Sequence, residues 1–134
     1  MDSKATIQEL RAFVDAFVIE RNWKPMHTPA SLATAISLES SELLQIFQWS
    51  SPEDGPRILK DRQQEISDEV ADVAITLIAF CNITGLDLDT AVRQKLAKQA
   101  LKYPVVSGQN AMNKQELYSL VQAQRATFNK AKTS

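Results

Sequence analysis

Residues 65–84 read EISDEVADVAITLIAFCNIT, and this stretch decides the fold. It contains no glycine or proline, and between Asp72 and Cys81 it is apolar on nearly every side. A helix that is apolar all round lies in the interior of its protein. The stretch therefore predicts a central helix, and Gly85 directly after it is a typical residue at which such a helix ends.

The segments on either side also predict helices. The chain has only 3 glycines and 5 prolines in 134 residues, and its apolar residues recur at helical spacing. The expected helices run from a cap at Ser3 to about Asn22, from about Ala30 to Trp49, from about Arg57 to Thr84, from Asp87 or Asp89 to near Tyr103 and Pro104, and over 113–131. For the second helix we expect Thr28 as the cap and Pro29 at the first position. The predicted fold class is all-α.

Composition is that of one soluble globular domain. Hydrophobic residues make up 44% and charged residues 23% of the chain. The net charge of −1 gives no general attraction to a nucleic acid polymer or an anionic membrane. A single Cys81 excludes an intramolecular disulfide, and its apolar neighbours predict an inert core thiol. Residues 1–10 show no signal sequence and no apolar run is long enough to span a membrane, so we expect a cytoplasmic protein.

Two acidic pairs, Glu39-x-x-Glu42 and Glu69-x-x-Asp72, lie in segments that otherwise predict buried helix. Residues three apart on a helix share a face, so each pair directs two carboxylates the same way. Helical projection places Glu39 inside the apolar stripe of its helix and Glu42 at the edge of that stripe. Carboxylates are rarely buried unless they are paired or bind metal, and oxygen-only ligation favours Mg²⁺ or Mn²⁺ over zinc. The four acids therefore predict a magnesium site.

The residues alone leave a second interpretation open. Acids three apart are common on exposed helices, where they face solvent or favour a helix N-terminus. In a non-catalytic helical interaction module, the same acids would form ion pairs between helices. Glu65 and Asp68 lie on the same side, and we expect them to face solvent or to support the ligands from outside.

Other candidate residues are basic or aromatic. Lys95, Lys98 and Lys102 share one face of the expected fourth helix, which is typical of a solvated face but would also neutralise phosphate beside a metal site. The aromatic residues Trp23, Phe47 and Trp49 flank the second helix and are suited either to the core or to stacking on a base, while the only histidine, His27, lies in a proline-bounded loop that suits a surface or capping role or a ligand contact. The sequence has no glycine-rich phosphate loop and no Cys/His metal spacing. Any catalysis would thus rest on metal and carboxylates.

Three stretches carry a resemblance to a known family. They are ERNWKPMHTPASLATAISLESSELLQIFQW at 20–49, EISDEVADVAI at 65–75 and KLAKQALKYP at 95–104. They resemble the MazG-like all-α nucleoside triphosphate pyrophosphohydrolases, especially the small branch typified by dCTP pyrophosphatase. With weaker similarity upstream, the resemblance covers roughly residues 11–104.

The resemblance implies a specific reaction and site. Family members cleave the α–β phosphoanhydride of (deoxy)nucleoside triphosphates to the monophosphate and pyrophosphate, with nucleotide-pool house-cleaning as the expected role. Glu39, Glu42, Glu69 and Asp72 match the Mg²⁺-binding acids, and either Glu39 or Glu42 is a candidate general base. The matching substrate-binding positions are Trp23, His27, Trp49, Thr76, Lys95, Gln99 and Tyr103.

The resemblance also implies an assembly. The family fold is a four-helix core that forms homodimers, often paired into homotetramers, with the pocket completed at the dimer interface. We accordingly expect residues 1–110 to form the MazG-like domain and 111–134 to form a C-terminal helical extension.

Two positions depart from the dCTP pyrophosphatase pattern. Thr76 stands where that branch commonly has tyrosine, and Gln99 stands where an asparagine that contacts the base is usual. A pocket discriminates bases through precisely placed polar groups. We therefore expect a relaxed base preference.

Overall fold

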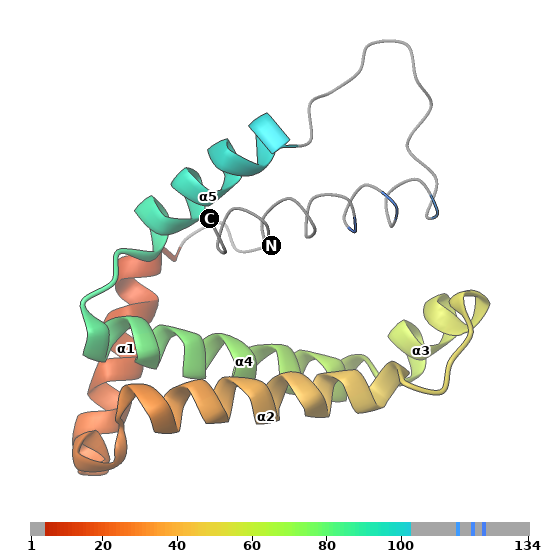
Figure 1. The fold of residues 1–134 in the computed structure, drawn as a ribbon. Coiled ribbons are helices and arrows are strands. Elements are labelled where there is room, and N and C mark those ends of the chain that lie inside the picture. The colour runs from red at the N-terminus through yellow and green to blue at the C-terminus, as the bar shows by residue number, and fades with distance from the viewer. Residues whose placement is uncertain (1–4, 103–114, 116–118, 120–121, 123–134) are drawn as a thin grey trace. The chain divides into compact units, whose positions relative to one another are not determined.

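The computed structural model of the chain describes residues 5–102 and, beyond them, Gln115, Ser119 and Gln122. The described part is helical, without a β-strand, and this confirms the all-α prediction (Figure 1). Its elements are α1 (Ile7–Glu20), the 3-10 helix η1 (Lys24–Met26), α2 (Pro29–Phe47), the 3-10 helix η2 (Pro52–Asp54), α3 (Gly55–Asp61), α4 (Gln63–Thr84) and α5 (Leu88–Lys102). The chain divides into two compact units, residues 1–95 and 96–134, and the candidate site lies within the first.

The first helix begins later than predicted. Thr6 is the N-cap of α1: its hydroxyl accepts a hydrogen bond from the Glu9 backbone N–H, and the Glu9 carboxylate accepts one from the Thr6 backbone N–H. This reciprocal pair satisfies two N–H groups that a helix start leaves free. The predicted cap, Ser3, is therefore wrong, and Ser3 itself lies outside the described residues.

The start of α2 follows the prediction. Thr28 caps it by accepting a hydrogen bond from the Ser31 backbone N–H at 3.1 Å, and Pro29 occupies the first helical position. Proline is suited to that position because its missing N–H would have no partner inside the helix. The prediction extended this helix to Trp49, but the helix ends at Phe47 and Trp49 lies just beyond it.

The predicted single helix over 57–84 is wrong, because the chain breaks at Arg62. The backbone of Arg62 has φ −119° and ψ 27°, away from helical values, and its N–H closes α3 on the carbonyl of Ile58 at 2.9 Å. Its side chain donates to the carbonyl of Ile46 at 3.2 Å, so a tertiary contact holds the break. At its other end α4 stops at Gly85, which has the left-handed φ of 68° that glycine adopts without strain.

Helices α2 and α4 run side by side in opposite directions and form the main packing contact (Figure 1). The buried side chains are Val18, Leu32, Ile46, Ile58, Ile78, Ala79 and Cys81, and the last confirms the predicted core thiol. Helix α1 is tied to the end of α4 through Arg11, which donates to the Asn82 side chain at 2.8 Å and to the Cys81 carbonyl at 3.2 Å.

Helix α4 contacts α1, α2 and α3, which confirms its predicted central position, but the described helices cover it only in part. Large apolar side chains remain exposed on α1 and α4, namely Ile7, Leu10, Phe13, Phe17 and Ile19 of α1 and Val70, Ile75, Leu77 and Ile83 of α4. Phe13 is 70% exposed although Ile7, Leu10, Phe13 and Phe17 recur at helical spacing, which predicts an apolar stripe on this helix. The apolar surface of these two helices thus exceeds what α2 and α3 bury.

Helix α5 begins as predicted after Asp87, whose carboxylate accepts a hydrogen bond from the Thr90 backbone N–H at 2.9 Å. It is described as far as Lys102, so Tyr103 and nearly all of the predicted helix over 113–131 lie outside the described residues. In the described part, no single helix is long and apolar enough to cross a membrane, and α4 reaches that length and composition only together with α5, as a bent pair.

Candidate metal centre

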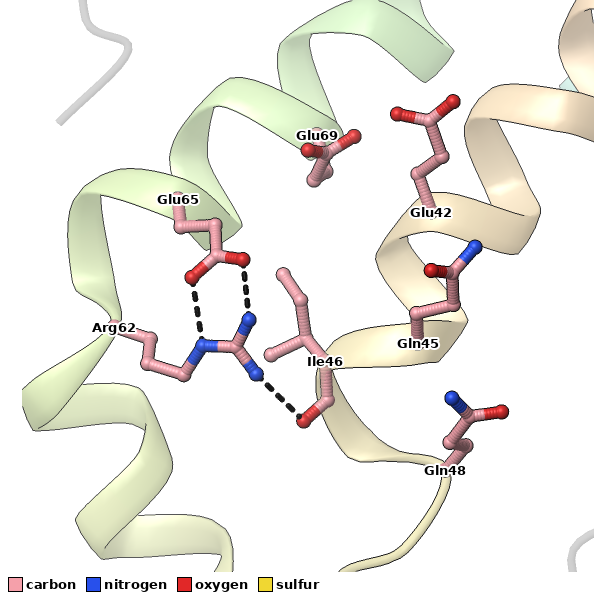
Figure 2. A pocket seen from close by; sticks show the side chains of 7 residues that line it. All are labelled: Glu42, Gln45, Ile46, Gln48, Arg62, Glu65 and Glu69. Atoms are coloured by element: carbon pink, nitrogen blue, oxygen red, sulfur yellow. Dashed lines mark hydrogen bonds and ion pairs between the residues drawn. The ribbon is translucent and has the colours of Figure 1, made fainter.

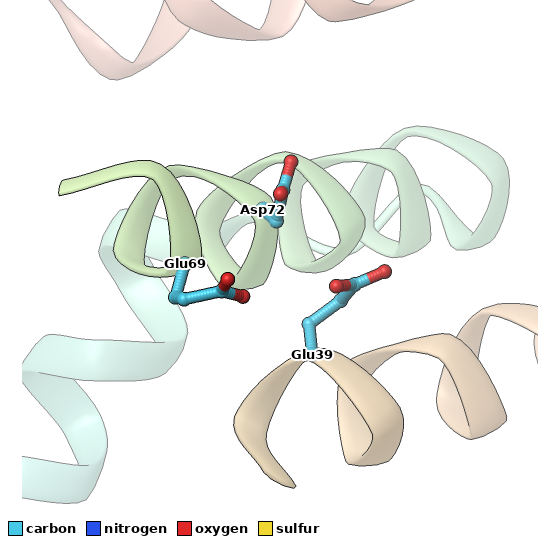
Figure 3. A group of neighbouring side chains, drawn as sticks. All are labelled: Glu39, Glu69 and Asp72. Carbon is cyan, nitrogen blue, oxygen red and sulfur yellow. The ribbon is translucent and has the colours of Figure 1, made fainter. Parts of the chain in front are cut away.

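Helices α2 and α4 bring three of the predicted acids together. Glu39 of α2 and Glu69 and Asp72 of α4 each place a carboxylate oxygen within 4.8 Å of the others (Figure 3). Two oxygens that each bind one ion at about 2.1–2.5 Å are at most about 5 Å apart. The three carboxylates are therefore close enough to share one divalent cation.

The surrounding sequence explains why Glu39 takes part. Leu32 and Ile46, each two turns from Glu39 along the same face of α2, are both buried. Glu39 lies between them and is half-buried, which confirms its predicted place inside the apolar stripe. Packing of that stripe turns the Glu39 carboxylate toward α4.

Electrostatics in the cluster are uncompensated. Burial, followed by the charges of Glu42 and Asp72, raises the pKa of Glu39 above its ordinary value. Burial also raises the pKa of Glu69, with further contributions from Glu42, Asp72, Glu39 and Glu65 in that order. Glu39 and Glu69 thus have negative neighbours, and no cation of the described residues is among the causes of either pKa shift.

One oxygen of Glu69 is both buried and unpaired. Its Oε2 atom has no hydrogen-bond partner among the described residues. A buried acceptor without a partner costs free energy, and a carboxylate costs more than a neutral group. Three oxygen donors with no nitrogen or sulfur fit Mg²⁺ or Mn²⁺, and such an ion would satisfy this atom.

The fourth predicted acid, Glu42, lies beside this group and not within it. It is exposed and lines a pocket of about 480 Å³ next to the cluster (Figure 2). The residues around the pocket are Glu42, Gln45, Ile46, Gln48, Arg62, Glu65 and Glu69. Glu42 nevertheless acts on the cluster, because its charge contributes to the raised pKa of both Glu39 and Glu69.

The two neighbouring acids of α4 have partners outside the cluster. Glu65 accepts hydrogen bonds from Arg62, and this contact lowers the pKa of Glu65. Asp68 accepts a hydrogen bond from the side-chain amide of Gln64 at 2.9 Å and is exposed. Arg62 is a site residue that sequence reasoning missed, although the spacing Arg62-x-x-Glu65 is a recognisable helical ion pair.

The predicted aromatic and histidine positions lie outside the α2–α4 packing. Trp23, in the turn after α1, is 40% exposed and meets the ring of Phe17 edge-on at 5.7 Å. Trp49 is 91% exposed, so the core interpretation is wrong for this residue. His27 is half-buried, and its Nδ1 atom has no hydrogen-bond partner in the described part of the chain.

The remaining predicted positions are on α4, on α5 and beyond it. Thr76 is half-buried one turn after Asp72, and its hydroxyl donates to the backbone carbonyl of Asp72 at 2.9 Å. Lys95 and Gln99 are exposed on α5, and Tyr103 lies outside the described residues.

Comparisons with known proteins agree with this architecture. The chain is 32% identical to dCTP pyrophosphatase 1 of Bos taurus over 105 residues, which cover 77% of this chain and 62% of the relative. It is 33% identical to dCTP pyrophosphatase 1 of Homo sapiens over 101 residues, covering 74% of this chain and 59% of that one. The alignments thus span about three fifths of the length of these curated relatives.

A solved structure and a family model extend the comparison. The crystal structure of a pyrophosphatase from Archaeoglobus fulgidus superposes with a TM-score of 0.72 at 36% sequence identity, covering 78% of this chain and 98% of that one. The model of the MazG-like family matches residues 34–117, which include all four predicted metal-binding acids. The chain belongs to the MazG-like family.

Proposed function

We propose that the chain is a Mg²⁺-dependent nucleoside triphosphate pyrophosphohydrolase. It cleaves the α–β phosphoanhydride of (deoxy)nucleoside triphosphates to the monophosphate and pyrophosphate and so removes surplus or noncanonical nucleotides. The observation that carries this proposal is the group of three carboxylates within 4.8 Å of one another, uncompensated, in a chain of the MazG-like family. The similarity to dCTP pyrophosphatase 1 supports a nucleoside triphosphate as the substrate.

In this proposal the four acids have two roles, metal binding and proton acceptance. Glu39, Glu69 and Asp72 hold the cation, which when bound neutralises phosphate charge and lowers the pKa of a water. Glu42 lies next to the three-carboxylate group and has an exposed side chain. In this proposal it is the general base that accepts the proton of the attacking water. The cleavage consumes one water, whose oxygen ends on a phosphate product and whose proton needs such an acceptor.

Substrate recognition is assigned to residues outside the acid cluster. Lys95 and Tyr103 would offset the charge of the phosphates, while Trp23, His27 and Trp49 would line the nucleotide pocket. The exposure of Trp49 supports this role, because a free aromatic face can stack on any base.

Base selectivity is expected to be modest. A site built from well-placed polar groups reaches discrimination of about 10⁴-fold, whereas a looser fit gives about 10–200-fold. Thr76 and Gln99 replace the larger aromatic and the shorter amide of the dCTP pyrophosphatase pattern, so we expect activity on several deoxynucleotides with a modest preference for cytosine or a modified base. Ranking kcat/KM across the four dNTPs tests this, and a preference for dCTP above about 10⁴-fold would contradict it.

The exposed apolar side chains of α1 and α4 support assembly as a homodimer or a dimer of dimers. In this proposal residues 1–110 form the domain that assembles, and residues 111–134 form a helical extension. Monomeric soluble proteins rarely leave large contiguous apolar patches in water. Light scattering on the purified chain tests this: a stable, active monomer of 15.0 kDa would contradict it.

The decisive test of the reaction is incubation with each dNTP and NTP in the presence of Mg²⁺, with pyrophosphate and orthophosphate measured separately. We expect pyrophosphate and the monophosphate in equal amounts. Release of orthophosphate alone would contradict α–β cleavage.

The exposed apolar residues also support a second candidate, a non-catalytic helical interaction module. Thermal unfolding with Mg²⁺ and a non-hydrolysable nucleotide separates the two, because a ligand of the folded state raises the melting temperature. A melting temperature unaffected by any nucleotide would favour the module.

A further inference from the structure

Arg62 joins the two helices that carry the acidic pairs. Its Nη1 atom donates to the backbone carbonyl of Ile46, in the last turn of α2, at 3.2 Å. Its Nε atom donates to the carboxylate of Glu65, in the first turn of α4, at 2.6 Å, and Nη2 donates to the other oxygen of the same carboxylate. Figure 2 shows the guanidinium between the two helices, with two hydrogen bonds to the Glu65 carboxylate and one to the Ile46 carbonyl.

This bridge is one helical turn from two of the candidate acids. Ile46 follows Glu42 by four residues on α2, and Glu65 precedes Glu69 by four residues on α4. Both acids line the pocket together with Arg62. A change in the separation of the helices at Arg62 would therefore move Glu42 and Glu69 apart or together.

The side chains of Arg62 and Glu65 are 40% and 47% exposed, so solvent screening limits the contribution of their ion pair to the free energy of unfolding. A planar guanidinium that holds a carboxylate through two hydrogen bonds does, however, fix an orientation that a flexible ammonium does not. Mg²⁺ needs such fixed geometry, since it accepts little departure from octahedral coordination.

We propose that Arg62 is a positioning residue for the metal centre. Its simultaneous hydrogen bonds to Glu65 and to the Ile46 carbonyl set the separation of α2 and α4 near Glu42 and Glu69. The inference rests on the proposed function to the extent that these acids bind a divalent cation. Arg62 touches neither the cation nor the substrate in this role. It acts through the placement of Glu42 and Glu69.

A role of Arg62 through charge alone is the alternative explanation, and a double variant separates the two. Arg62→Met combined with Glu65→Gln removes one positive and one negative charge, so the net charge beside the cluster stays the same while the bridge is lost. Mn²⁺ binding, measured from the electron paramagnetic resonance signal of the free ion, should weaken about tenfold, as is common when groups that orient metal ligands are removed. Wild-type affinity in this variant would overturn the proposal.

Two further variants keep the experiment decisive. Arg57→Met with Asp61→Asn removes a pair of the same charges on α3, where the contacts of Arg57 stay within η2 and α3. It should bind Mn²⁺ as the wild type does, and equal weakening in this control would overturn the specific role of Arg62. Arg62→Lys keeps the charge but not the planar fork, so it should also bind Mn²⁺ more weakly, and it replaces the double variant if that one does not fold.

Kinetics give an independent measurement. The half-saturating Mg²⁺ concentration for pyrophosphate release should rise about tenfold in the double variant, while kcat at saturating Mg²⁺ stays within about threefold, because Glu39, Glu42, Glu69 and Asp72 are all unchanged. A fall in kcat that Mg²⁺ does not restore would overturn the positioning role. If the wild type itself bound no Mn²⁺, the metal centre and the role of Arg62 would both be refuted, whereas equal binding by wild type and double variant refutes the role of Arg62 alone.

Discussion

Glu65 and Glu69 are the same residue type one turn apart on α4, yet their surroundings are opposite. Glu65 is held by Arg62, and this contact lowers its pKa. Glu69 has a buried oxygen without a partner in the described residues, and burial with the surrounding acids raises its pKa. One turn of helix thus separates a carboxylate that pairs with a protein cation from one that has no such partner in the described part of the chain.

The difference is what marks the inner acids as a candidate metal site. Arg62 lies directly before α4, and in the described contacts it pairs with the outer acid Glu65 and not with the inner ones. Among the described residues, no ion pair offsets the negative charge of the inner group of Glu39, Glu69 and Asp72, and a bound cation would do so. Each prediction below changes one side of this contrast and leaves the other intact.

The largest effect is expected from Asp72→Asn, which removes one charge from the inner group while preserving volume. Pyrophosphate release should fall at least ~10²-fold, because metal and transition-state charge are no longer neutralised. The matched control is Asp68→Asn, one turn earlier on the same helix, which alters an exposed acid paired only with Gln64 in the described contacts. Near-normal turnover of the Asp72 variant at limiting Mg²⁺ would show that this residue is not a ligand.

The position of the inner acid Glu39 can be predicted well from the sequence. The rotation per residue in a helix is fixed, so the spacing of Leu32, Glu39 and Ile46 is sufficient to place Glu39 on the face that packs against α4. The same argument applies to Thr28 and Gly85, because capping and left-handed backbone are properties of a few neighbouring residues.

The helix break at Arg62 and the membership of the three-carboxylate group depend instead on contacts between residues that are distant in sequence. The break at Arg62 is held by a hydrogen bond to Ile46, sixteen residues away in sequence, and local spacing gives no sign of it. The exclusion of Glu42 from the three-carboxylate group has the same origin. Spacing says which acids share a face, whereas the register of α2 against α4 decides which of them meet.

The second prediction concerns stability in the presence of metal. A cation that binds only the folded chain at about 100 times its Kd should add about 2.7 kcal/mol to the free energy of unfolding. Chemical denaturation with Mg²⁺ and with EDTA measures this for the wild type, for Asp72→Asn and for Asp68→Asn. We expect the gain in the wild type and in Asp68→Asn, and its loss in Asp72→Asn. The same gain in all three proteins would place the cation elsewhere.

The smallest effect is expected in the metal-free protein. Because the folded-state pKa of Glu69 is raised above the ordinary 4.5, the folded state binds its proton more tightly than the unfolded state does. Its unfavourable contribution therefore grows as pH rises above 4.5 through the raised pKa. Glu69→Gln, which mimics the protonated form, should melt slightly above the wild type in EDTA at neutral pH.

Thermal melts of both proteins across the acidic to neutral range test this sign. The gap between variant and wild type should widen with rising pH and then level off. The contribution of Glu65 to stability should have the opposite pH dependence, because its pKa is lowered. That contribution is stabilising at neutral pH and is lost on acidification. A Glu69→Gln variant less stable than the wild type at neutral pH would contradict the uncompensated charge.

The most direct measurement is a crystal grown with Mn²⁺ and examined for anomalous scattering at the manganese absorption edge. The predicted result is a peak enclosed by Glu39, Glu69 and Asp72, with Glu65 still bound to Arg62. An absent peak, or a peak held by Glu65 in place of the inner group, would contradict the account.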